Sequence, residues 1–279
     1  AGIFFSSGTT GLPKGIVLPH KNIMAQMQHT RAAWHIQSDD IFLNLIPHFI
    51  SALVYALMAC YSMGCTNVIM ERFEPERFLE VTQRERVTVA FMLTNQLTSL
   101  LEYPDIDKYD LSSLRLIAYG GAPMPLEVAT RLIKSVGNIF AQCYGLQETA
   151  LITGLPLEDR ELYSLKGGEK RLLSAGREVI PGEMRIVDDE GRDVAPGEIG
   201  EIIVKGDNVM KSYWKLPQVT ADALKGGYLY TGDMATIDEE GYIYLADRKK
   251  DTIIRGSRRI YYREVEEAIY HHPSVLETA

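Results

Sequence analysis

The stretch TNVIMERFEPERFLEVTQRERVTVAFML, residues 66–93, reads as a strand, a helix and a second strand in succession. Residues 66–70 and 88–93 are short runs rich in β-branched and apolar side chains, which is typical of buried strands. Between them, residues 74–87 mix charged and apolar side chains in the pattern of an amphipathic helix. The stretch therefore predicts two parallel strands joined by a helix.

The same alternation extends to both sides of this stretch. Residues 19–34 predict a helix, as do residues 95–103 and 125–136, and strand patterns occupy residues 114–119 and 138–144. In the helix of residues 125–136, one face is apolar and contains Ala129, Leu132, Ile133 and Val136. We expect an α/β fold in which a parallel sheet is flanked by helices.

Two polar segments follow strands of this sheet. Gly120, Gly121 and Ala122 come after one strand, and residues 144–149, YGLQET, come after the next. Ligands of open α/β sheets bind beyond the carboxyl ends of the strands, so both segments are candidates for a binding site.

From about Ser174 the pattern changes to short β runs separated by tight turns, in residues 184–194, 197–206 and 235–245. These runs predict hairpins of a small β-barrel-like subdomain. A basic run follows in residues 248–263 and leads into a helix pattern shortly before Ala279. We expect three units: residues 1–170, residues 171–246, and residues 247–279 as the start of a C-terminal α+β lid.

Composition limits the possible functions of the chain. Its 279 residues are 46% hydrophobic and carry a net charge of −8, which argues against nucleic-acid binding. Residues 41–70 lack charged side chains, but their unbroken apolar run, residues 52–61, is too short for a membrane span and predicts a buried helix. The three cysteines lack zinc-ligand spacing, which favours free thiols and a cytoplasmic location.

The segment SSGTTGLPKG, residues 6–15, is similar to a phosphate-binding P-loop and differs from it at two positions. Pro13 stands where a P-loop has glycine, and Gly15 stands where it has a hydroxyl residue. Residues 3–5 and 16–18 read as strands, so the segment lies in a hairpin rather than before a helix. Its glycines, hydroxyls and Lys14 suit the binding of a triphosphate, although an ordinary hydrophilic turn remains the alternative.

Six ordered segments together resemble the acyl-CoA synthetase branch of the adenylate-forming, AMP-binding enzymes, with bacterial fatty-acid:CoA ligases as the nearest group. They are SSGTTGLPKG (6–15), YGGAPMP (119–125), YGLQET (144–149), GEIGEIIVKGDNVMKSYW (197–214), YTGD (230–233) and DRKKDTIIRG (247–256). The resemblance implies an enzyme that converts a carboxylic acid, ATP and coenzyme A into an acyl-CoA through acyl-AMP. It also implies that Mg2+ accompanies ATP, and it leaves peripheral membrane contact open.

The resemblance also implies roles for individual residues. The phosphates would be bound by Ser6, Ser7, Gly8, Thr9, Thr10, Gly11 and Lys14, and the adenosine by Gly120, Gly121, Ala122, Tyr144, Gly145, Asp233 and Arg248. Lys14, Gln147 and Glu148 would be catalytic, with Glu148 as the ligand of Mg2+. Lys250 would be the hinge of the lid, and Gly256 and Ser257 would lie beside CoA.

Each of these residues also has a simpler interpretation. Glu148 would then be a surface residue at a helix start, Tyr144 a core residue, and the glycines and Asp233 parts of turns. The basic run around Lys250 would be a solvated face.

The chain departs from the family pattern in four respects. Gln147 replaces a threonine that touches the α-phosphate, and Ile50 stands where the family has a histidine near the acyl tunnel, with His48 two places away. Ser257 and Tyr262 replace a glycine and a proline of the lid. The family's catalytic lid lysine has no counterpart before Ala279, so we expect these 279 residues alone to adenylate poorly.

Three other functions stay open at this point. They are a non-enzymatic nucleotide-binding remnant, an adenylating enzyme that transfers its acyl group to a carrier protein, and a P-loop hydrolase. Pro13, Gly15 and the hairpin argue against the hydrolase. The sequence gives no indication of the oligomeric state or of the chain length of the acid.

Overall fold

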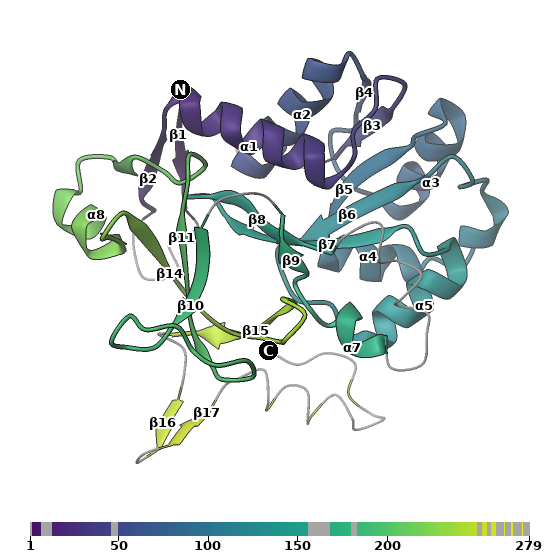
Figure 1. Cartoon of the computed structure of the whole chain (residues 1–279). Helices are drawn as coiled ribbons and strands as arrows, with labels where there is room; N and C mark the ends of the chain where they lie inside the picture. The colour runs from purple at the N-terminus through teal and green to yellow at the C-terminus, as the bar shows by residue number, and fades with distance from the viewer. Residues whose placement is uncertain are drawn as a thin grey trace.

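Figure 1 shows the computed structural model of the chain. It describes residues 2–6, 13–45, 50–155, 168–179, 183–249, 253–255 and 258–260, together with Val265, Ile269 and Val275. Of the predicted units, the lid of residues 247–279 is thus described only in part.

The largest sheet has seven strands in the order β4-β3-β5-β6-β7-β8-β9. Five of them are parallel: β4 (Thr66–Ile69), β3 (Ile41–Asn44), β5 (Val89–Leu93), β6 (Leu116–Gly120) and β7 (Phe140–Leu146). The last two, β8 (Ala150–Gly154) and β9 (Arg177–Glu178), run antiparallel at one edge. The predicted parallel sheet is confirmed, and its antiparallel edge was not foreseen.

Helices cover both faces of this sheet (Figure 1). α1 (His20–Ala33) and α2 (Ser51–Met63) pack together on one face, and α4 (Thr94–Leu101) and α5 (Leu126–Val136) lie on the other, with α3 (Pro75–Glu85) against α4. Shorter elements are η1 (Ile106–Lys108), α7 (Glu169–Leu172) and α8 (Pro217–Ala223).

The local sequence explains how these helices begin, end and pack. Pro75 occupies the first turn of α3, where its missing N–H leaves no helix hydrogen bond unmade. α2 ends at Gly64, whose φ of 79° lies in the left-handed region that glycine adopts most readily. α5 buries Ala129 and Leu132 from the face predicted to be apolar, and Ile133 and Val136 are partly buried beside them.

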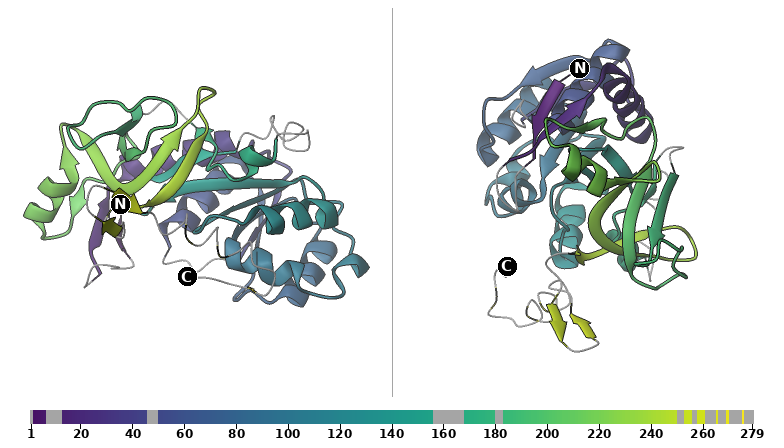
Figure 2. Two further views of the ribbon diagram at one scale, coloured as in Figure 1. Left: turned by 90° about the horizontal axis from the view of Figure 1, so that it is seen from below. Right: turned by 90° about the vertical axis from the view of Figure 1, so that its left-hand side faces the viewer.

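A second sheet has five strands, all antiparallel: β10 (Glu183–Val187), β11 (Gly200–Lys205), β14 (Tyr228–Ile237), β13 (Leu224–Lys225) and β15 (Ile243–Arg248). It corresponds to the predicted β-barrel-like part, and it lies beside the seven-stranded sheet in both views of Figure 2. The predicted N-terminal hairpin is also present, since β1 (Gly2–Phe5) pairs with β2 (Gly15–Leu18).

Two short strand pairs complete the architecture. β12 (Ser212–Tyr213) joins the edge of the hairpin by pairing with β2. β16 (Ile253–Arg255) and β17 (Arg258–Ile260) form a two-stranded sheet in the region expected to begin the lid.

The burial of α2 confirms the prediction of a buried helix in residues 52–61. On α2, Ala56, Ala59 and Cys60 are fully buried. Among the described residues, no helix combines the length and apolar character needed to cross a membrane. Cys60, Cys65 and Cys143 are free thiols, as predicted.

One simpler interpretation of the sequence is wrong. Glu148 does not begin a helix, because β7 and β8 form an antiparallel hairpin and Glu148 lies in the turn between them. Gly145 permits this hairpin, since a Cβ there would lie 1.8 Å from the Ala150 carbonyl oxygen.

Candidate active site

A cavity of about 700 Å³ lies where the three larger sheets meet. Its lining includes Lys14 from the β1–β2 hairpin, Tyr144 and Glu148 from the β7–β8 hairpin, and Gly232 and Arg248 from the second sheet. On the side of α1 and α2 the cavity extends into a region we call the apolar arm, lined by Trp34, Ile50, Ser51, Tyr55, Phe91 and Leu93. Segments far apart in the sequence therefore surround one space.

Tyr213 connects the two charged residues predicted to serve the phosphates. The Lys14 Nζ lies 4.8 Å from the centre of the Tyr213 ring, and the Tyr213 hydroxyl donates a 2.9 Å hydrogen bond to Glu148 Oε1. Burial, followed by the charge of Glu148, raises the pKa of Tyr213, so the phenol remains a donor.

Backbone contacts fix the base of the predicted phosphate loop. The Ser6 N–H donates to the Lys14 carbonyl over 3.0 Å, and the Lys14 N–H donates to Ser6 Oγ over 3.2 Å. The position of Lys14 relative to the cavity is thus set by the hairpin. Ser7, Gly8, Thr9, Thr10 and Gly11 lie outside the described residues.

Tyr144, Asp233 and Arg248 form a second polar group. The Tyr144 hydroxyl donates to Asp233 Oδ2 over 2.8 Å, and Arg248 Nε lies 3.3 Å from Asp233 Oδ1. Burial raises the pKa of Asp233, while the Tyr144 hydrogen bond and the Arg248 charge lower it in part. Asp233 is not itself among the residues that line the cavity, but both of its partners are.

Glu201 supports the part of β14 that carries Asp233. It is buried, accepts a 3.0 Å hydrogen bond from the Gly232 N–H, and pairs with Lys249 Nζ at 3.0 Å. These contacts join β11 to the middle of β14 and to the residue that follows β15. Lys250, the predicted hinge, and Gly256 and Ser257, the predicted CoA contacts, lie outside the described residues.

The glycines predicted to lie against adenine have a structural requirement of their own. A Cβ at Gly120 would lie 2.7 Å from the Cys143 carbonyl oxygen, and Gly121 has a φ of 92°. Gly120 and Gly121 line the cavity, as does Gly145, whereas Ala122 does not.

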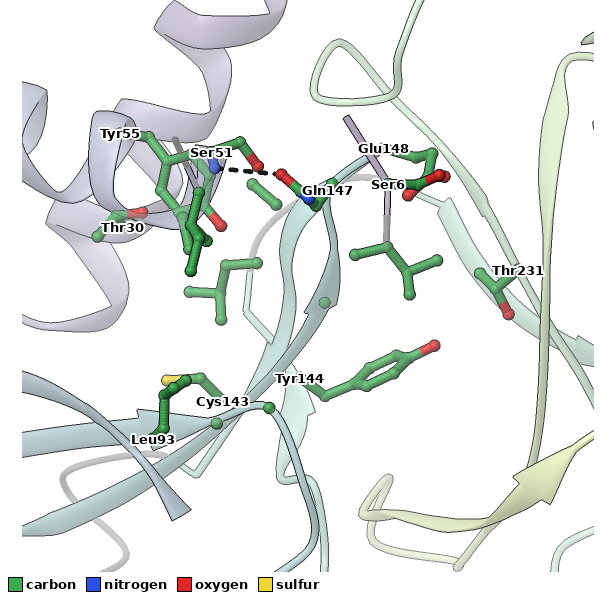
Figure 3. A pocket seen from close by; sticks show the side chains of 18 of the residues that line it. Ser6, Thr30, Ser51, Tyr55, Leu93, Cys143, Tyr144, Gln147, Glu148 and Thr231 are labelled. Carbon is green, nitrogen blue, oxygen red and sulfur yellow. Dashed lines mark hydrogen bonds between the residues drawn. The ribbon is translucent and has the colours of Figure 1, made fainter. Parts of the chain in front are cut away.

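Gln147 bridges two elements of the site. Its Nε2 donates to the Phe5 carbonyl over 2.6 Å, and its Oε1 accepts a 3.2 Å hydrogen bond from the Ser51 N–H (Figure 3). Gln147 thus ties the end of β1, next to the phosphate loop, to the start of α2. Its predicted contact with an α-phosphate remains a prediction.

Glu148 is suited to a magnesium ion that is also held by phosphate. Within the described residues, no group of three or more His, Cys, Asp or Glu side chains could hold a metal ion. Glu148 offers a hard carboxylate oxygen at the cavity wall, and Mg2+ commonly takes one or two carboxylates together with phosphate oxygens and water. The donor set therefore fits Mg2+ carried by a nucleotide.

Sequence reasoning missed several residues of the site. Tyr213 lies within a quoted motif, but nothing in a single sequence marks it as the link between Lys14 and Glu148. Trp34, Ser51 and Tyr55 reach the cavity only because α1 and α2 pack together over the sheet. Ile50, at the family's histidine position, does line the cavity.

Comparison with known proteins agrees with this arrangement. Residues 1–214 match the model of the AMP-binding enzyme family. The chain is 36% identical over 278 residues to a long-chain-fatty-acid–CoA ligase of Bacillus subtilis, covering 98% of this chain and 48% of that protein. It is also 36% identical to a feruloyl-CoA synthase of Amycolatopsis sp, covering 98% of this chain and 54% of that protein.

Solved structures of related synthetases are similar to this chain over nearly its whole length. The o-succinylbenzoate coenzyme A synthetase of Bacillus subtilis, in complex with ATP and a magnesium ion, superposes with a TM-score of 0.87 at 34% identity, covering 99% of this chain and 55% of that one. The amide bond synthetase McbA of Marinactinospora thermotolerans gives 0.89 at 33% identity, with 99% and 55% coverage. The chain spans about half the length of the relatives it matches. By sequence and by fold, the chain belongs to the AMP-binding enzyme family.

Proposed function

We propose that the protein containing this chain is an ATP-dependent acid:CoA ligase. A carboxylate oxygen of the acid attacks the α-phosphate of ATP and displaces pyrophosphate, giving acyl-AMP. The thiol of CoA then attacks the acyl carbon, loses its proton and displaces AMP, giving the thioester.

The single observation that carries this proposal is the shared cavity. It joins a cation, Lys14, and a carboxylate, Glu148, to the Tyr144–Asp233–Arg248 group and to the apolar arm. Activation of an acid needs all four features, because the carboxylate of the acid and the triphosphate are both anions that must be brought together. The apolar part of the acid must be held in place at the same time.

Each residue of the site has a separate role in binding ATP and Mg2+. Lys14 and the hydroxyls of the loop neutralise the β- and γ-phosphates, and Glu148 holds Mg2+, which reduces the repulsion between the carboxylate and the triphosphate. Tyr144 packs against the adenine. Asp233 accepts from the ribose hydroxyls through the lone pairs that Tyr144 and Arg248 leave free.

Relatives support this assignment at the level of reaction type. Their names include fatty-acid and feruloyl-CoA ligases, and one solved relative contains ATP and magnesium. A fatty acid, the expectation from sequence, and an aryl acid both fit that range of names. Binding of CoA by Gly256 and Ser257 and movement about Lys250 remain part of the proposal.

A panel of carboxylic acids tests the function on the full-length protein. Pyrophosphate release should require both an acid and Mg2+, and a thioester should form only when CoA is added. Acid-dependent pyrophosphate release with no thioester would indicate a carrier protein or an amine as the acceptor. Nucleotide binding without acid-dependent pyrophosphate release would contradict the proposal and favour a non-enzymatic remnant.

A further inference from the structure

The turn that carries Glu148 is held by two of its backbone carbonyls. The Glu148 carbonyl accepts a 2.7 Å hydrogen bond from the Met210 N–H, and the Thr149 carbonyl accepts a 3.0 Å hydrogen bond from Asn208 Nδ2. Asn208 is 3% exposed, so water does not compete for this bond. Both donors lie between β11 and β12, in residues 206–211, which we call the 206–211 loop. One loop therefore fixes the backbone on which the Glu148 side chain is mounted.

This loop is held in turn by α1. Asn22 Nδ2 donates to the carbonyls of Asp207 and Val209 over 2.6 and 2.8 Å. Gln26 Nε2 donates to the Asn208 carbonyl over 2.9 Å. Asn22 and Gln26 are one helical turn apart, so both amides lie on the same face of α1. Three successive carbonyls of the loop thus have donors from a single helix.

The two amides of α1 are only half paired. Asn22 Oδ1 and Gln26 Oε1 are buried and have no hydrogen-bond partner among the described residues. The orientation of each amide is fixed, because its nitrogen must face the carbonyls of the loop. A half-paired buried polar group is an unfavourable way to fill a core. The amides are therefore explained by the loop that they hold.

Glu148 lies at the end of this chain of buried contacts. The 206–211 loop holds its backbone, and Tyr213, in the strand that follows the loop, holds its carboxylate. On the other side of the turn, the Gln147 side chain is bonded to the end of β1 and to the start of α2. A carboxylate that binds a metal benefits from such support, because the contacts that orient a metal ligand contribute to the affinity for the metal.

Building on the proposed function, we propose that Asn208 is a positioning residue for Glu148. Its side-chain amide holds the turn so that the Glu148 carboxylate meets the Mg2+ of the nucleotide without rearranging, and Gln26 and Asn22 keep Asn208 in place. Asn208 is not among the residues that line the cavity, so its effect passes through Glu148.

Metal binding without turnover tests this proposal on the full-length protein. We suggest titrating Mn2+, which takes the same oxygen ligands as Mg2+, into protein saturated with α,β-methylene-ATP, and following free Mn2+ by electron paramagnetic resonance. Asn208→Ala should raise the Kd for Mn2+ about tenfold, the usual effect of removing a contact that orients a metal ligand. At saturating Mg2+, the KM for the acid should stay within about twofold of the wild-type value, because the apolar arm is untouched.

Thr153→Val is the matched control. The Thr153 hydroxyl is buried and donates to the Ala175 carbonyl over 2.7 Å, and neither residue lines the cavity. This variant should lower the melting temperature about as much as Asn208→Ala and leave the affinity for Mn2+ unchanged. If Asn208→Ala does not fold, Gln26→Met decides the outcome, because it removes the donor to Asn208 and keeps the size of the side chain. It should raise the Kd for Mn2+ about threefold or more.

The possible failures can be told apart. An unchanged affinity for Mn2+ in the deciding variant, or an equal loss of affinity in Thr153→Val, would overturn this inference, as would wild-type affinity in Glu148→Gln. Because Mn2+ binding is measured without an acid, these results are separate from the proposed function. That function fails if no acid of any kind supports pyrophosphate release.

Discussion

Tyr213 is the residue on which the charged part of the site depends. Its ring lies beside the Lys14 ammonium and its hydroxyl donates to Glu148, so one side chain positions both the cation and the carboxylate. A hydrogen bond to a charged group contributes about 1.5–3 kcal/mol, which is enough to affect the proposed binding of Mg2+ by Glu148.

Tyr213→Phe keeps the ring beside Lys14 and removes the hydrogen bond to Glu148. We expect the Mg2+ concentration for half-maximal pyrophosphate release to rise about tenfold, corresponding to the loss of one charge-assisted bond. Titrating Mg2+ at saturating acid measures this effect. Tyr228→Phe is the control, since it removes a similar Tyr–Glu bond, to Glu183, outside the cavity. An unchanged Mg2+ dependence in Tyr213→Phe would show that Tyr213 does not position Glu148.

Glu148 itself gives a stronger prediction. Glu148→Gln keeps the size of the side chain and removes its charge, so kcat should fall by about 10²–10³, the usual loss when an electrostatic contact to a transition state is removed. Acid-dependent pyrophosphate release measures this change, with Glu183→Gln as a surface control. Wild-type rates in Glu148→Gln would remove the metal assignment.

At the scale of elements, an ion pair between the buried Asp40 and the half-buried Arg115 holds the parallel sheet together at the end opposite the cavity. Asp40, just before β3, accepts from the Gln37 N–H, from Thr88 before β5 and from Arg115 before β6. Burial raises the pKa of Asp40, but the hydrogen bonds from Arg115, Gln37 and Thr88 and the Arg115 charge bring it below its ordinary value of 3.8. This network joins three strands that follow one another in the sheet.

The pH dependence of stability tests this network. Because the folded pKa of Asp40 is lowered, its contribution is fully present above the unfolded pKa and is lost as the pH falls through the folded value. Asp40→Asn should lower the free energy of unfolding by about 2 kcal/mol at pH 7, a value between those of exposed and buried pairs. The difference from wild type should shrink below about pH 4. Denaturant unfolding at several pH values measures it.

Asp105→Asn provides a comparison, because it breaks an exposed pair with Lys108 and should change stability little. If Asp40→Asn and Asp105→Asn have equal effects at pH 7, Asp40 does not join the strands as described.

Periodicity predicted most elements but not those decided by tertiary contacts. The strand, helix and strand of residues 66–93 appear as β4, α3 and β5, because their apolar spacing matches their burial. β3 was missed because Ile41–Asn44 lies in an uncharged stretch where strand and helix patterns cannot be separated. The hairpin of β7 and β8 was missed because its sharp return depends on the contact between Gly145 and Ala150.

At the scale of the whole molecule, three sheets must meet to complete the site. Lys14 follows the loop between β1 and β2, Glu148 lies in the β7–β8 turn, and Asp233 lies in β14. The motifs identified these residues. Only the packing of the sheets shows that Tyr213 contacts both Lys14 and Glu148, and that Tyr144 donates a hydrogen bond to Asp233. The apolar arm was not predictable, because its lining comes from β5 and from the ends of α1 and α2, whose contacts a single sequence does not determine.

The most direct test of the account is the exchange of radiolabelled pyrophosphate into ATP by the full-length protein. The account predicts label in ATP only when a carboxylic acid and Mg2+ are both present, because Lys14, Glu148 and the Tyr144–Asp233 pair act on one nucleotide while the apolar arm holds the acid. Hydrolysis of ATP to ADP and phosphate at a rate indifferent to acid, with no label returning to ATP, would contradict it.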